Sequence, residues 1–390
     1  MKFDLVIVGA GIAGLSLAVA LRSTPLSIAI VEARAGTARA VNAADAAWDT
    51  RIYALSPANQ RFFASIGAWQ HFARERMAPV RRMEISGDAG GRLEFSAYDS
   101  GVDELAWIVE ASLLQNELWQ TVKRQGNVTV LCPATPAALT FDAAQAHLVL
   151  ADGRALSAAL IVAADGADSW TRRAAGIAVD FKLYGALGVV ANFSCATAHD
   201  DCAYQWFRHD GVLAWLPLPG NRLSMVWSTP EAEAQELLGL SAAELCDRVA
   251  LAGNWCLGEL QLLTPAAAFP LRMMRAPRSV MPRLALIGDA AHCIHPLSGH
   301  GLNLGLQDSQ VLARLLAERP DYIDCGDERL LRRYERERLE QVLVLQSTTD
   351  ALQRLFRPQH ALLSLLRNAG LNFTNTLPVV RDALVRYALG

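Results

Sequence analysis

Residues 284–308 read LALIGDAAHCIHPLSGHGLNLGLQD, and the other motifs of the chain are understood from this segment. The apolar run Leu284–Ile287 predicts a buried strand that ends at Gly288. A loop of small residues follows, and a helix is expected from Leu302 through Leu315. A helix N-terminus carries unpaired N–H groups and a partial positive charge. The segment therefore suits a flat, electron-poor ring that becomes negative on reduction, as a flavin does.

A second glycine-rich segment lies near the N-terminus. Asp4–Val8 predicts a buried parallel strand, GAGIAG follows at residues 9–14, and a helix is expected over Leu15–Ser23. The next strand, Ser27–Val31, ends at Glu32. This is GxGxxG in the strand–turn–helix–strand context of a dinucleotide site, where glycines admit a pyrophosphate and the acid accepts from ribose hydroxyls. The fingerprint alone does not separate NAD from FAD.

A third strand also ends in a candidate site. Leu160–Ala164 runs into Asp165 and Gly166. Because the strand ends of a doubly wound sheet open on one side, one extended nucleotide can touch all three loops. For Asp165 a helix cap is the alternative interpretation. Arg51, ahead of a helix predicted over Pro57–Ile66, can meet a phosphate or the flavin edge, or can be a surface or salt-bridged arginine.

Composition describes a globular chain. Of its 390 residues, 52% are hydrophobic and 19% are charged, which is typical of a folded protein with a sizeable core. The net charge of -3 argues against a nucleic-acid partner. The seven cysteines are scattered without a CxxC pair, so we expect reduced thiols in a cytoplasmic protein without a secretory signal. Leu5–Leu21 is mostly apolar but too short for a convincing membrane span.

The middle of the chain reads as antiparallel sheet. The expected strands are Val189–Ser194, Ala203–His209, Gly211–Pro217 and Leu223–Ser228, and Val80–Ser86 with Arg92–Phe95 reads as a hairpin. Aromatic residues concentrate here: Trp206, Phe207, Trp215 and Trp227. They can line an apolar pocket for an aromatic substrate, or they can simply pack within the sheet. A long helix of mixed charge, Glu328–Leu355, is expected to present a solvated face.

Together these segments resemble the class A FAD-dependent aromatic hydroxylases, the p-hydroxybenzoate hydroxylase superfamily, and within it the ubiquinone-biosynthesis hydroxylases. The resemblance covers nearly the whole chain. The motifs that carry it are GAGIAG, DTRIYALSPANQRFFASIGAW, WIVEASLLQNEL, ADGADSWTRRAAGI, LALIGDAAHCIHPLSGHGLNLGLQD and the C-terminal LLRNAGLNFTN. The GD-AAH-HP-GxGLNLG pattern is very specific, and the tail points to the quinone branch.

The resemblance implies a set of cofactor contacts and no nameable catalytic residue. It places Arg51 along the FAD, Asp289 on the ribityl chain and the helix start at the flavin N1–C2 carbonyl edge. Asp165 and Gly166 belong to a motif associated with both FAD and the reduced nicotinamide. The implied contacts are Gly9, Ala10, Gly11, Ile12, Ala13, Gly14, Glu32, Ala33, Arg34, Arg51, Asp165, Gly166, Asp289, Pro296, Gly299, His300, Gly301, Leu302 and Asn303.

The chain departs from the family pattern twice. Gly299-His300-Gly301 replaces the usual GQG, and Glu110-Ala111-Ser112 stands where Glu-Asn-Arg is common. The first departure brings a titratable group near the ring, and the second removes expected polar contacts. His292, His295 and His300 also invite a metal interpretation. Flavin binding accounts for that loop, however, and no HExxH or cysteine pair is present, so we expect no metal.

The implied activity is that of an FAD-dependent monooxygenase. NAD(P)H would donate electrons and O₂ would be the co-substrate, with oxygen transferred from a flavin C4a-hydroperoxide to an aromatic ring. The implied substrate is lipophilic, a polyprenylated phenol or benzoquinol intermediate of ubiquinone biosynthesis. The alternatives are a soluble phenol hydroxylase, another flavoenzyme of the same fold such as a prenyl-group reductase, and a non-catalytic accessory subunit of a ubiquinone-biosynthesis complex.

The predicted fold is α/β, with a doubly wound, Rossmann-like FAD-binding domain interleaved with a mainly antiparallel substrate domain. The FAD-binding domain is expected at 1–78, 101–178 and 272–350, and the substrate domain at 79–100 and 179–271. Residues 351–390 are expected to form an apolar helical tail. Three roles are open for the tail: contact with the inner-membrane surface, contact with partner subunits or a homo-oligomer, and packing against the body.

Overall fold

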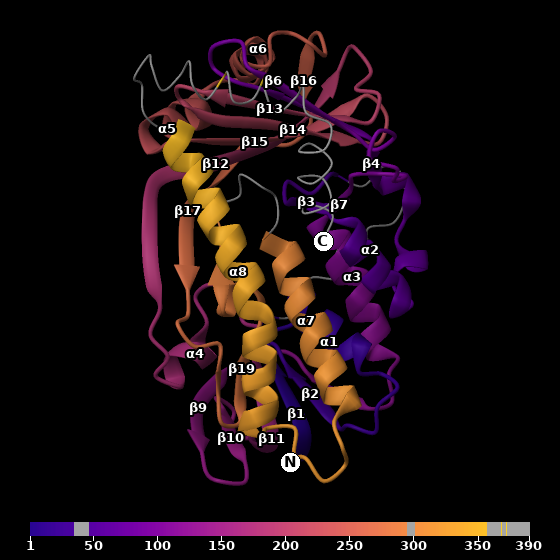
Figure 1. The fold of residues 1–390 in the computed structure, drawn as a ribbon, viewed down its shortest axis with the longest axis vertical. Coiled ribbons are helices and arrows are strands. Elements are labelled where there is room, and N and C mark those ends of the chain that lie inside the picture. The colour runs from indigo at the N-terminus through magenta and orange to yellow at the C-terminus, as the bar shows by residue number, and fades with distance from the viewer. Residues whose placement is uncertain (35–46, 295–300, 357–367, 369–371, 373–390) are drawn as a thin grey trace.

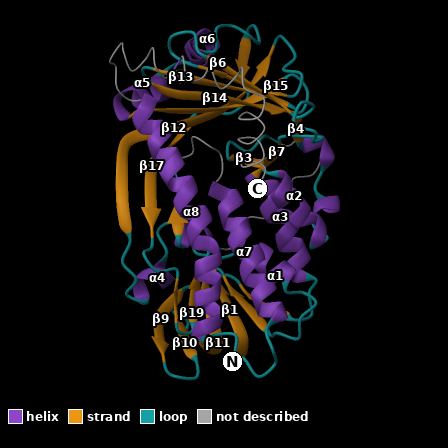
Figure 2. Ribbon diagram, in the orientation of Figure 1, coloured by secondary structure: helices purple, strands orange, loops and turns teal. Residues whose placement is uncertain are grey.

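The computed structural model describes residues 1–34, 47–294, 301–356, 368 and 372. Within them the strands form sheets of eight, nine and three strands. In Figures 1 and 2 the eight-stranded sheet lies at one end of the molecule behind a layer of helices, and the nine-stranded sheet lies at the other end. The expected α/β class is confirmed, with a parallel central sheet at one end and a mainly antiparallel sheet, in which only β13 and β5 pair in parallel among the described strands, at the other.

The eight-stranded sheet has the order β18-β19-β11-β1-β2-β8, with β10 and β9 extending from β11. Its strands are β1 (Lys2–Val8), β2 (Ile28–Val31), β8 (Val128–Leu131), β9 (Pro136–Phe141), β10 (Ala146–Leu150), β11 (Ala155–Ala163), β18 (Val280–Met281) and β19 (Leu284–Leu286). The central strands β8, β2, β1, β11 and β19 are parallel to one another. They are apolar along their length because both faces of the sheet are covered.

Helices cover one face of this sheet. They are α1 (Ile12–Ala20), α2 (Pro57–Ser65), α3 (Ala111–Lys123), α7 (Gly301–Glu318) and α8 (Glu328–Phe356), with the short α4 (Trp170–Ala174) near β9. The Ser56 hydroxyl accepts from the Asn59 N–H and caps α2, the helix predicted over Pro57–Ile66. Helix α1 begins at Ile12, inside the glycine motif and three residues earlier than its apolar pattern suggests.

The nine-stranded sheet has the order β20-β17-β12-β15-β14-β13-β5-β6, with β16 beside β12. Its strands are β5 (Arg82–Ser86), β6 (Arg92–Ser96), β12 (Asp180–Cys195), β13 (Cys202–Arg208), β14 (Gly211–Leu218), β15 (Arg222–Pro230), β16 (Leu260–Leu262), β17 (Ala267–Arg275) and β20 (His292–Cys293). The expected hairpin of β5 and β6 is confirmed by their antiparallel register.

Helices α5 (Glu231–Gly239) and α6 (Ala242–Ala252) pack on one face of this sheet. Trp206, Trp215 and Trp227 lie in the core beneath them. Ordinary packing is therefore the correct interpretation for these three indole rings. Phe207 follows Trp206 in the same strand, so its side chain points to the opposite face.

A small antiparallel sheet lies between the two large ones. It has the order β3-β7-β4, made of β3 (Ile52–Leu55), β7 (Ala106–Glu110) and β4 (Ala78–Val80). Short 3₁₀ turns are η1 (Trp69–His71), η2 (Arg74–Arg76) and η3 (Gly288–Ala290). Ala78, Val80 and Ile108 pack against residues of β13 and β14, which joins this sheet to the nine-stranded one.

The sequence did not predict β7, β9 or β17. In β17 Pro270 interrupts the pattern, and its register with β12 shifts between Leu183 and Leu187. The strand also crosses the expected boundary between residue 271, the end of the substrate domain, and residue 272, where the FAD-binding domain was expected to resume. Strands β12 and β17 are long and run together from the nine-stranded sheet toward the eight-stranded one, so they join the two expected domains (Figure 1). The exact domain bounds stay a prediction.

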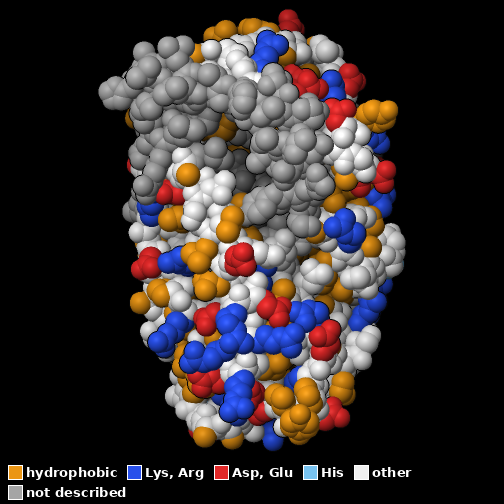
Figure 3. Space-filling model, in the orientation of Figure 1, with side chains coloured by type: hydrophobic (Ala, Val, Ile, Leu, Met, Phe, Trp, Pro, Cys, Tyr) orange, Lys and Arg blue, Asp and Glu red, His pale blue; other side chains and the backbone are white. Residues whose placement is uncertain are grey.

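The face crossed by α8 is charged with both signs (Figure 3). Arg332 pairs with Glu328, and Arg333 and Arg314 both pair with Glu337. The expected solvated face of this helix is thus confirmed. Among the described residues, no helix combines the length and the apolar character needed to cross a bilayer.

Two asparagines of the C-terminal region contact the turn between β5 and β6. Asn368 is buried, and its Oδ1 accepts from the N–H groups of Gly91 at 2.8 Å and Ala89 at 3.3 Å. Its amide donates to Asp88 Oδ1 at 2.8 Å, and Asn372 Oδ1 accepts from the Arg92 N–H at 2.8 Å. At these two residues the chain packs against its own body; the rest of the predicted tail beyond 356 lies outside the described residues.

Gly91→Ala should loosen this contact. A Cβ atom at Gly91 would lie 2.5 Å from Asn368 Oδ1 and 2.9 Å from its Cα, so the asparagine must move. We expect faster cleavage of the C-terminal region in limited proteolysis followed by mass spectrometry, and Asn368→Ala should behave alike. Gly126→Ala is the matched control, because its Cβ meets open space. Unchanged cleavage in both variants would contradict the proposed anchoring.

Candidate functional site

The strand ends that carry the three predicted loops lie side by side. Val8 at the end of β1 pairs with Val31 on one side and Ala163 on the other, and Ala163 pairs with Leu286. The loops that follow these parallel strands therefore leave the same edge of the sheet. The prediction that one edge brings together the glycine loop, Glu32, Asp165 and Asp289 is confirmed as a placement. Their roles toward a cofactor stay predictions.

The three motif glycines of the first loop have different surroundings. Gly9 has φ +105°, and a Cβ there would lie 2.4 Å from the Ala164 carbonyl oxygen. A Cβ at Gly14 would lie 2.4 Å from the Gly9 oxygen, so both positions require glycine for packing. At Gly11 the nearest atom would be the Ala164 oxygen at 4.0 Å. Of the three glycines, only Gly11 has open space next to its Cα atom, and a pyrophosphate can approach the backbone there.

Helix α1 offers its N-terminus to this opening. Gly11 is the N-cap residue, no side chain caps the helix, and its first turn holds no acidic residue. Ala10, Ile12 and Ala13 complete the loop with small or apolar side chains. The free N–H groups and the helix dipole form a site suited to an anion.

Glu32 fixes the loop from the neighbouring strand. Its Oε2 accepts from the Ala10 N–H at 2.8 Å, and its Oε1 accepts from the Arg34 N–H at 2.9 Å. Gln115 on α3 donates to the Ala10 carbonyl at 2.9 Å. A carboxylate oxygen has more than one lone pair, so Glu32 can still accept from a ribose hydroxyl. Ala33 and Arg34 follow it at the same edge.

Asp165 uses one carboxylate oxygen within the protein. Its Oδ2 accepts from the Thr171 N–H and hydroxyl, both at 2.9 Å, so this oxygen supports the first turn of α4, whose N-cap residue is Ser169. Its Oδ1 is buried and has no hydrogen-bond partner among the described residues. A buried acceptor of this kind is costly unless a ligand completes it. Gly166 beside it has φ +82° and faces open space.

Arg172 ties the Asp165 loop to the Asp289 loop. It is buried, and its guanidinium donates to the Ala290 and Ala167 carbonyls, both at 2.8 Å. Burial lowers the pKa of Arg172, and nearby Asp165 acts in the opposite direction. The sequence motif DSWTRR contained this arginine without indicating its role.

Asp289 lies among cationic side chains. Asp289 itself is exposed at this edge. Nearby protein atoms raise the pKa of its carboxyl group, whereas Arg51, His292 and Arg272 act in the opposite direction. Tyr53 raises the pKa of Arg51, with Asp289 adding to the effect. Arg51 is exposed, within electrostatic reach of Asp289, and its guanidinium lies 5.6 Å from the Tyr53 ring centre.

Helix α7 begins at Gly301, next to Leu302 and Asn303, as expected. The Asn303 side chain has a structural use. Its Oδ1 accepts from the Ser56 N–H at 3.0 Å, and its amide donates to the Ala54 carbonyl at 2.8 Å. The first turn of α7 contains no acidic residue, so its backbone N–H groups can stabilise negative charge. His295, Pro296, Gly299 and His300 lie outside the described residues.

Sequence reasoning missed the group that fixes the Arg51 segment. Glu110 is fully buried and forms a two-bond ion pair with Arg76, at 2.6 and 2.7 Å. Its Oε1 also accepts from the Asp49 N–H at 2.6 Å, and the Asp49 carboxylate accepts from the N–H groups of Arg51 and Ser112. The unusual Glu110-Ala111-Ser112 segment therefore holds the loop through backbone contacts. The signal available in the sequence was that Glu110 matches the family pattern Glu-Asn-Arg, whereas Ala111 and Ser112 depart from it.

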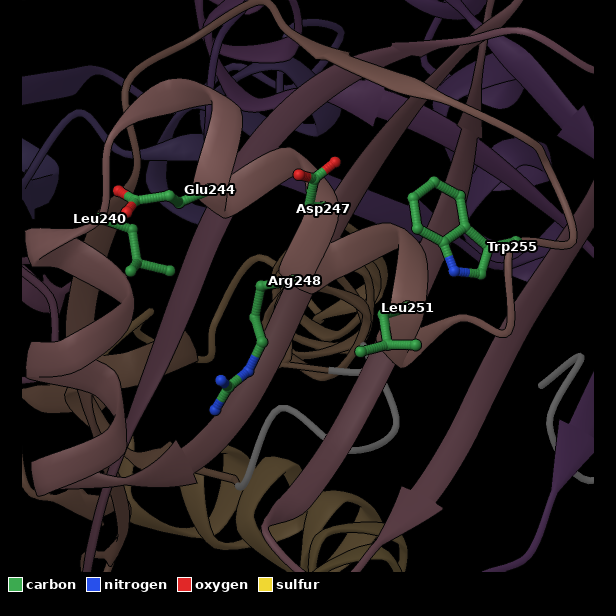
Figure 4. Close-up of a pocket in the computed structure, with 6 residues that line it drawn as sticks. All are labelled: Leu240, Glu244, Asp247, Arg248, Leu251 and Trp255. Atoms are coloured by element: carbon green, nitrogen blue, oxygen red, sulfur yellow. The ribbon is translucent and has the colours of Figure 1, made fainter.

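Two other features lie apart from this constellation. A shallow hollow on the outer side of α6 contains none of the predicted cofactor contacts; Leu240, Glu244, Asp247, Arg248, Leu251 and Trp255 line it (Figure 4). In the described part of the chain, no group of three or more His, Cys, Asp or Glu side chains is arranged to hold a metal ion.

The residues fit FAD. The opening over Gly11 and the uncapped start of α1 suit a pyrophosphate, and Glu32 lies where a ribose would follow. The partnerless Asp165 Oδ1, the carboxylate of Asp289 and the start of α7 continue along the same edge. An extended dinucleotide can satisfy each of these groups in turn.

Exchanges at Gly11 and Gly14 should separate binding from packing. Gly11→Ala should leave the melting temperature of the FAD-free protein unchanged and weaken FAD binding about tenfold or more, because the new methyl group fills the opening over the loop. Gly14→Ala should destabilise the FAD-free fold by about 1–3 kcal/mol through overpacking. Calorimetry and fluorescence titration measure both effects. FAD affinity unchanged by Gly11→Ala would place the pyrophosphate elsewhere.

Asp289→Asn should weaken FAD binding and should slightly raise the melting temperature of the FAD-free protein. The pKa of Asp289 is raised in the folded chain, so its ionised form costs some folding free energy above that pKa, but the residue is exposed and water screens most of this cost. The FAD-free variant should melt only slightly higher than the parent at pH 7, and this small gap should close as pH falls through the pKa of Asp289. FAD retention should weaken at the same time. A lower melting point with full FAD occupancy would argue against both assignments; Asp152→Asn, on an exposed hairpin turn, is the control.

Comparison with known proteins agrees with this geometry. A family model described as an FAD binding domain matches residues 2–346. The chain is 33% identical over 388 residues to the 3-demethoxyubiquinol 3-hydroxylase of Escherichia coli, covering 99% of this chain and 98% of that protein. It is 33% identical over 390 residues to the ubiquinone hydroxylase UbiL of Rhodospirillum rubrum, covering 99% and 89%. With the human mitochondrial ubiquinone biosynthesis monooxygenase COQ6 the identity is 29% over 434 residues, covering 99% and 92%.

Solved structures share the fold. PqsL of Pseudomonas aeruginosa, in complex with 2-aminobenzoylacetate, superposes with a TM-score of 0.77 at 24% identity, covering 95% of this chain and 99% of that one. HpxO of Klebsiella pneumoniae, complexed with FAD and uric acid, gives a TM-score of 0.74 at 19% identity, covering 99% and 97%. The chain belongs to the FAD-dependent monooxygenases of the p-hydroxybenzoate hydroxylase superfamily, in the family that includes the ubiquinone-biosynthesis hydroxylases.

Proposed function

We propose that this enzyme hydroxylates the aromatic ring of a polyprenylated phenol or benzoquinol intermediate of ubiquinone biosynthesis, with NAD(P)H as the electron donor. The observation that carries the proposal is the end-to-end match to a 3-demethoxyubiquinol 3-hydroxylase, 33% identical over 98% of that protein's length. The match includes the C-terminal region, so it extends beyond the nucleotide-binding core.

The chain's own residues would bind the FAD and orient its flavin ring. The Gly11 backbone and the start of α1 would hold the pyrophosphate, Glu32 the adenosine ribose and Asp289 the ribityl chain. The N-terminus of α7 would face the flavin ring, where its N–H groups stabilise negative charge without reorganising during the reaction. When bound, FAD supplies the two-electron chemistry and the activation of O₂ that insertion of one oxygen atom requires.

The face of the nine-stranded sheet opposite α5 and α6 is apolar and suits an aromatic ring. Val190, Ala214 and Val226 form one row across β12, β14 and β15, on the face opposite the helix-covered core. Asn192 of β12 donates to the Asp49 carbonyl at 2.9 Å, which turns this face toward the Arg51 segment. An aromatic substrate held here would lie between aliphatic side chains and the cofactor, where water is excluded.

The proposal that NAD(P)H is the electron donor rests on the loop that contains Asp165 and Gly166. Asp165 and Gly166 belong to the motif that the family associates with both FAD and the reduced nicotinamide, and Asp165 Oδ1 is buried without a described partner. NADH and NADPH should therefore be compared directly in stopped-flow reduction of the bound flavin.

Deletion of the gene tests the function. Lipid extracts of the deletion strain should accumulate a prenylated ring that lacks one hydroxyl group, seen by mass spectrometry, and the mass and fragmentation identify the carbon. The wild-type gene should restore ubiquinone, whereas Gly11→Ala should restore it poorly. Purified enzyme should consume NAD(P)H in the presence of this accumulated lipid and incorporate one ¹⁸O atom from ¹⁸O₂.

Other outcomes point to the alternatives. Unchanged quinone levels together with rapid oxidation of a small water-soluble phenol would identify a soluble phenol hydroxylase. Full restoration of ubiquinone by a variant shown to bind no FAD would identify an accessory subunit. Either result overturns the proposal.

A further inference from the structure

A buried carboxylate lies behind the Gly288–Asp289 turn, one layer away from the FAD site. Asp308 on α7 is fully buried. Its Oδ2 accepts from the Gly288 N–H at 2.8 Å and from His292 Nε2 at 2.7 Å. Its Oδ1 accepts from Arg338 Nε at 2.6 Å. One side chain thus connects the end of β19, strand β20, helix α7 and helix α8.

Arg338 completes the group from α8. It is buried, and besides Asp308 its guanidinium donates to the Leu304 carbonyl and to Gln307 Oε1, both at 3.3 Å. The arginine therefore holds the first turns of α7 as well as the carboxylate. Burial raises the pKa of Asp308, but His292 and Arg338 outweigh it, so the pKa is held below its usual value and the carboxylate is charged. Such a charge persists in a core only when its partners are in place.

The Gly288 N–H depends on this carboxylate. Gly288 has φ +59°, a left-handed conformation that turns the chain out of β19. Gly305 of α7 packs against it, since a Cβ there would lie 3.1 Å from the Gly288 Cα. Ser309 of α7 donates to the Ala13 carbonyl at 2.9 Å, which fixes α7 against α1. The direction in which the next residue, Asp289, leaves the turn follows from how Gly288 is held.

We infer that Asp308, held by Arg338 and His292, is the positioning residue that sets both Asp289 and the start of α7 against the flavin. This inference rests on the proposed placement of FAD along the strand ends. Asp308 lies one layer behind the proposed cofactor site. It acts through the Gly288 N–H and through the orientation in which it holds α7. The two groups that would contact the flavin and its ribityl chain therefore share one anchor.

Asp308→Asn tests the inference with little change of shape. An amide accepts through one oxygen only, so it cannot serve the Gly288 N–H, His292 and Arg338 together. We expect the FAD dissociation constant to rise about tenfold or more, measured by fluorescence titration at a temperature where the FAD-free variant is folded. At saturating FAD the visible circular dichroism band of the flavin should also change, because its neighbours have shifted.

Glu335→Gln is the matched control. Glu335 also lies on α8, and its Oε1 accepts from a backbone N–H, that of Ser279, at 2.8 Å. It fixes the start of β18 rather than the Gly288 turn. The control should lower the melting temperature without changing FAD affinity or the dichroism band. Arg338→Lys keeps the positive charge but loses the planar guanidinium that contacts Asp308, Leu304 and Gln307 together. It should raise the FAD dissociation constant about threefold to tenfold.

The outcomes separate the inference from the proposed function. If the parent protein binds no FAD, the FAD site itself is wrong. If the parent binds FAD and folded Asp308→Asn binds it within twofold with an unchanged dichroism band, the positioning role is overturned. If Asp308→Asn does not fold, Arg338→Lys decides: unchanged affinity and spectrum overturn the inference, and weakened affinity supports it.

Discussion

Everything in the site depends on the contact between the glycine loop and the end of β11. The backbone at Gly9 passes so close to Ala164 that any side chain would collide with its carbonyl oxygen. This contact is possible because β1 and β11 run in parallel and in register from Lys2 to Val8. It places the start of α1 beside Asp165 without intervening side chains. A larger residue would separate the two loops, and a single extended cofactor would no longer reach both.

Two aspartates near the flavin position illustrate how surroundings set the role of a carboxylate. Asp308 accepts from three donors, and its pKa is lowered although it is fully buried. Asp289 lies nineteen positions earlier in the same motif; it is exposed, and its pKa is raised despite cationic neighbours. The first is completed by the protein and serves as an anchor. The carboxylate of the second accepts no hydrogen bond from a described residue, and in the proposed function it is the one that binds the ribityl chain.

Local signals were sufficient for the fold and for the placement of the loops. Apolar runs followed by glycine and an acid identified β1, β11 and β19, and their shared edge follows from parallel topology. Long-range pairings were not readable. Arg338 meets Asp308 from a different helix, and Arg76 meets Glu110 across a segment of unrelated pattern. The use of Asn303 as a structural tie was hidden because its partner, Ala54, is distant in sequence.

The order of strands has a consequence for synthesis on the ribosome. Strand β1 is the first to emerge, but its neighbour β11 ends at Ala163 and β19 ends at Leu286. Likewise β5 must wait for β13, which begins at Cys202. A nascent chain therefore carries apolar strands without their partners until most of it has been translated, a state prone to aggregation. We therefore expect the yield of folded protein to rise when chaperones are supplied during its synthesis.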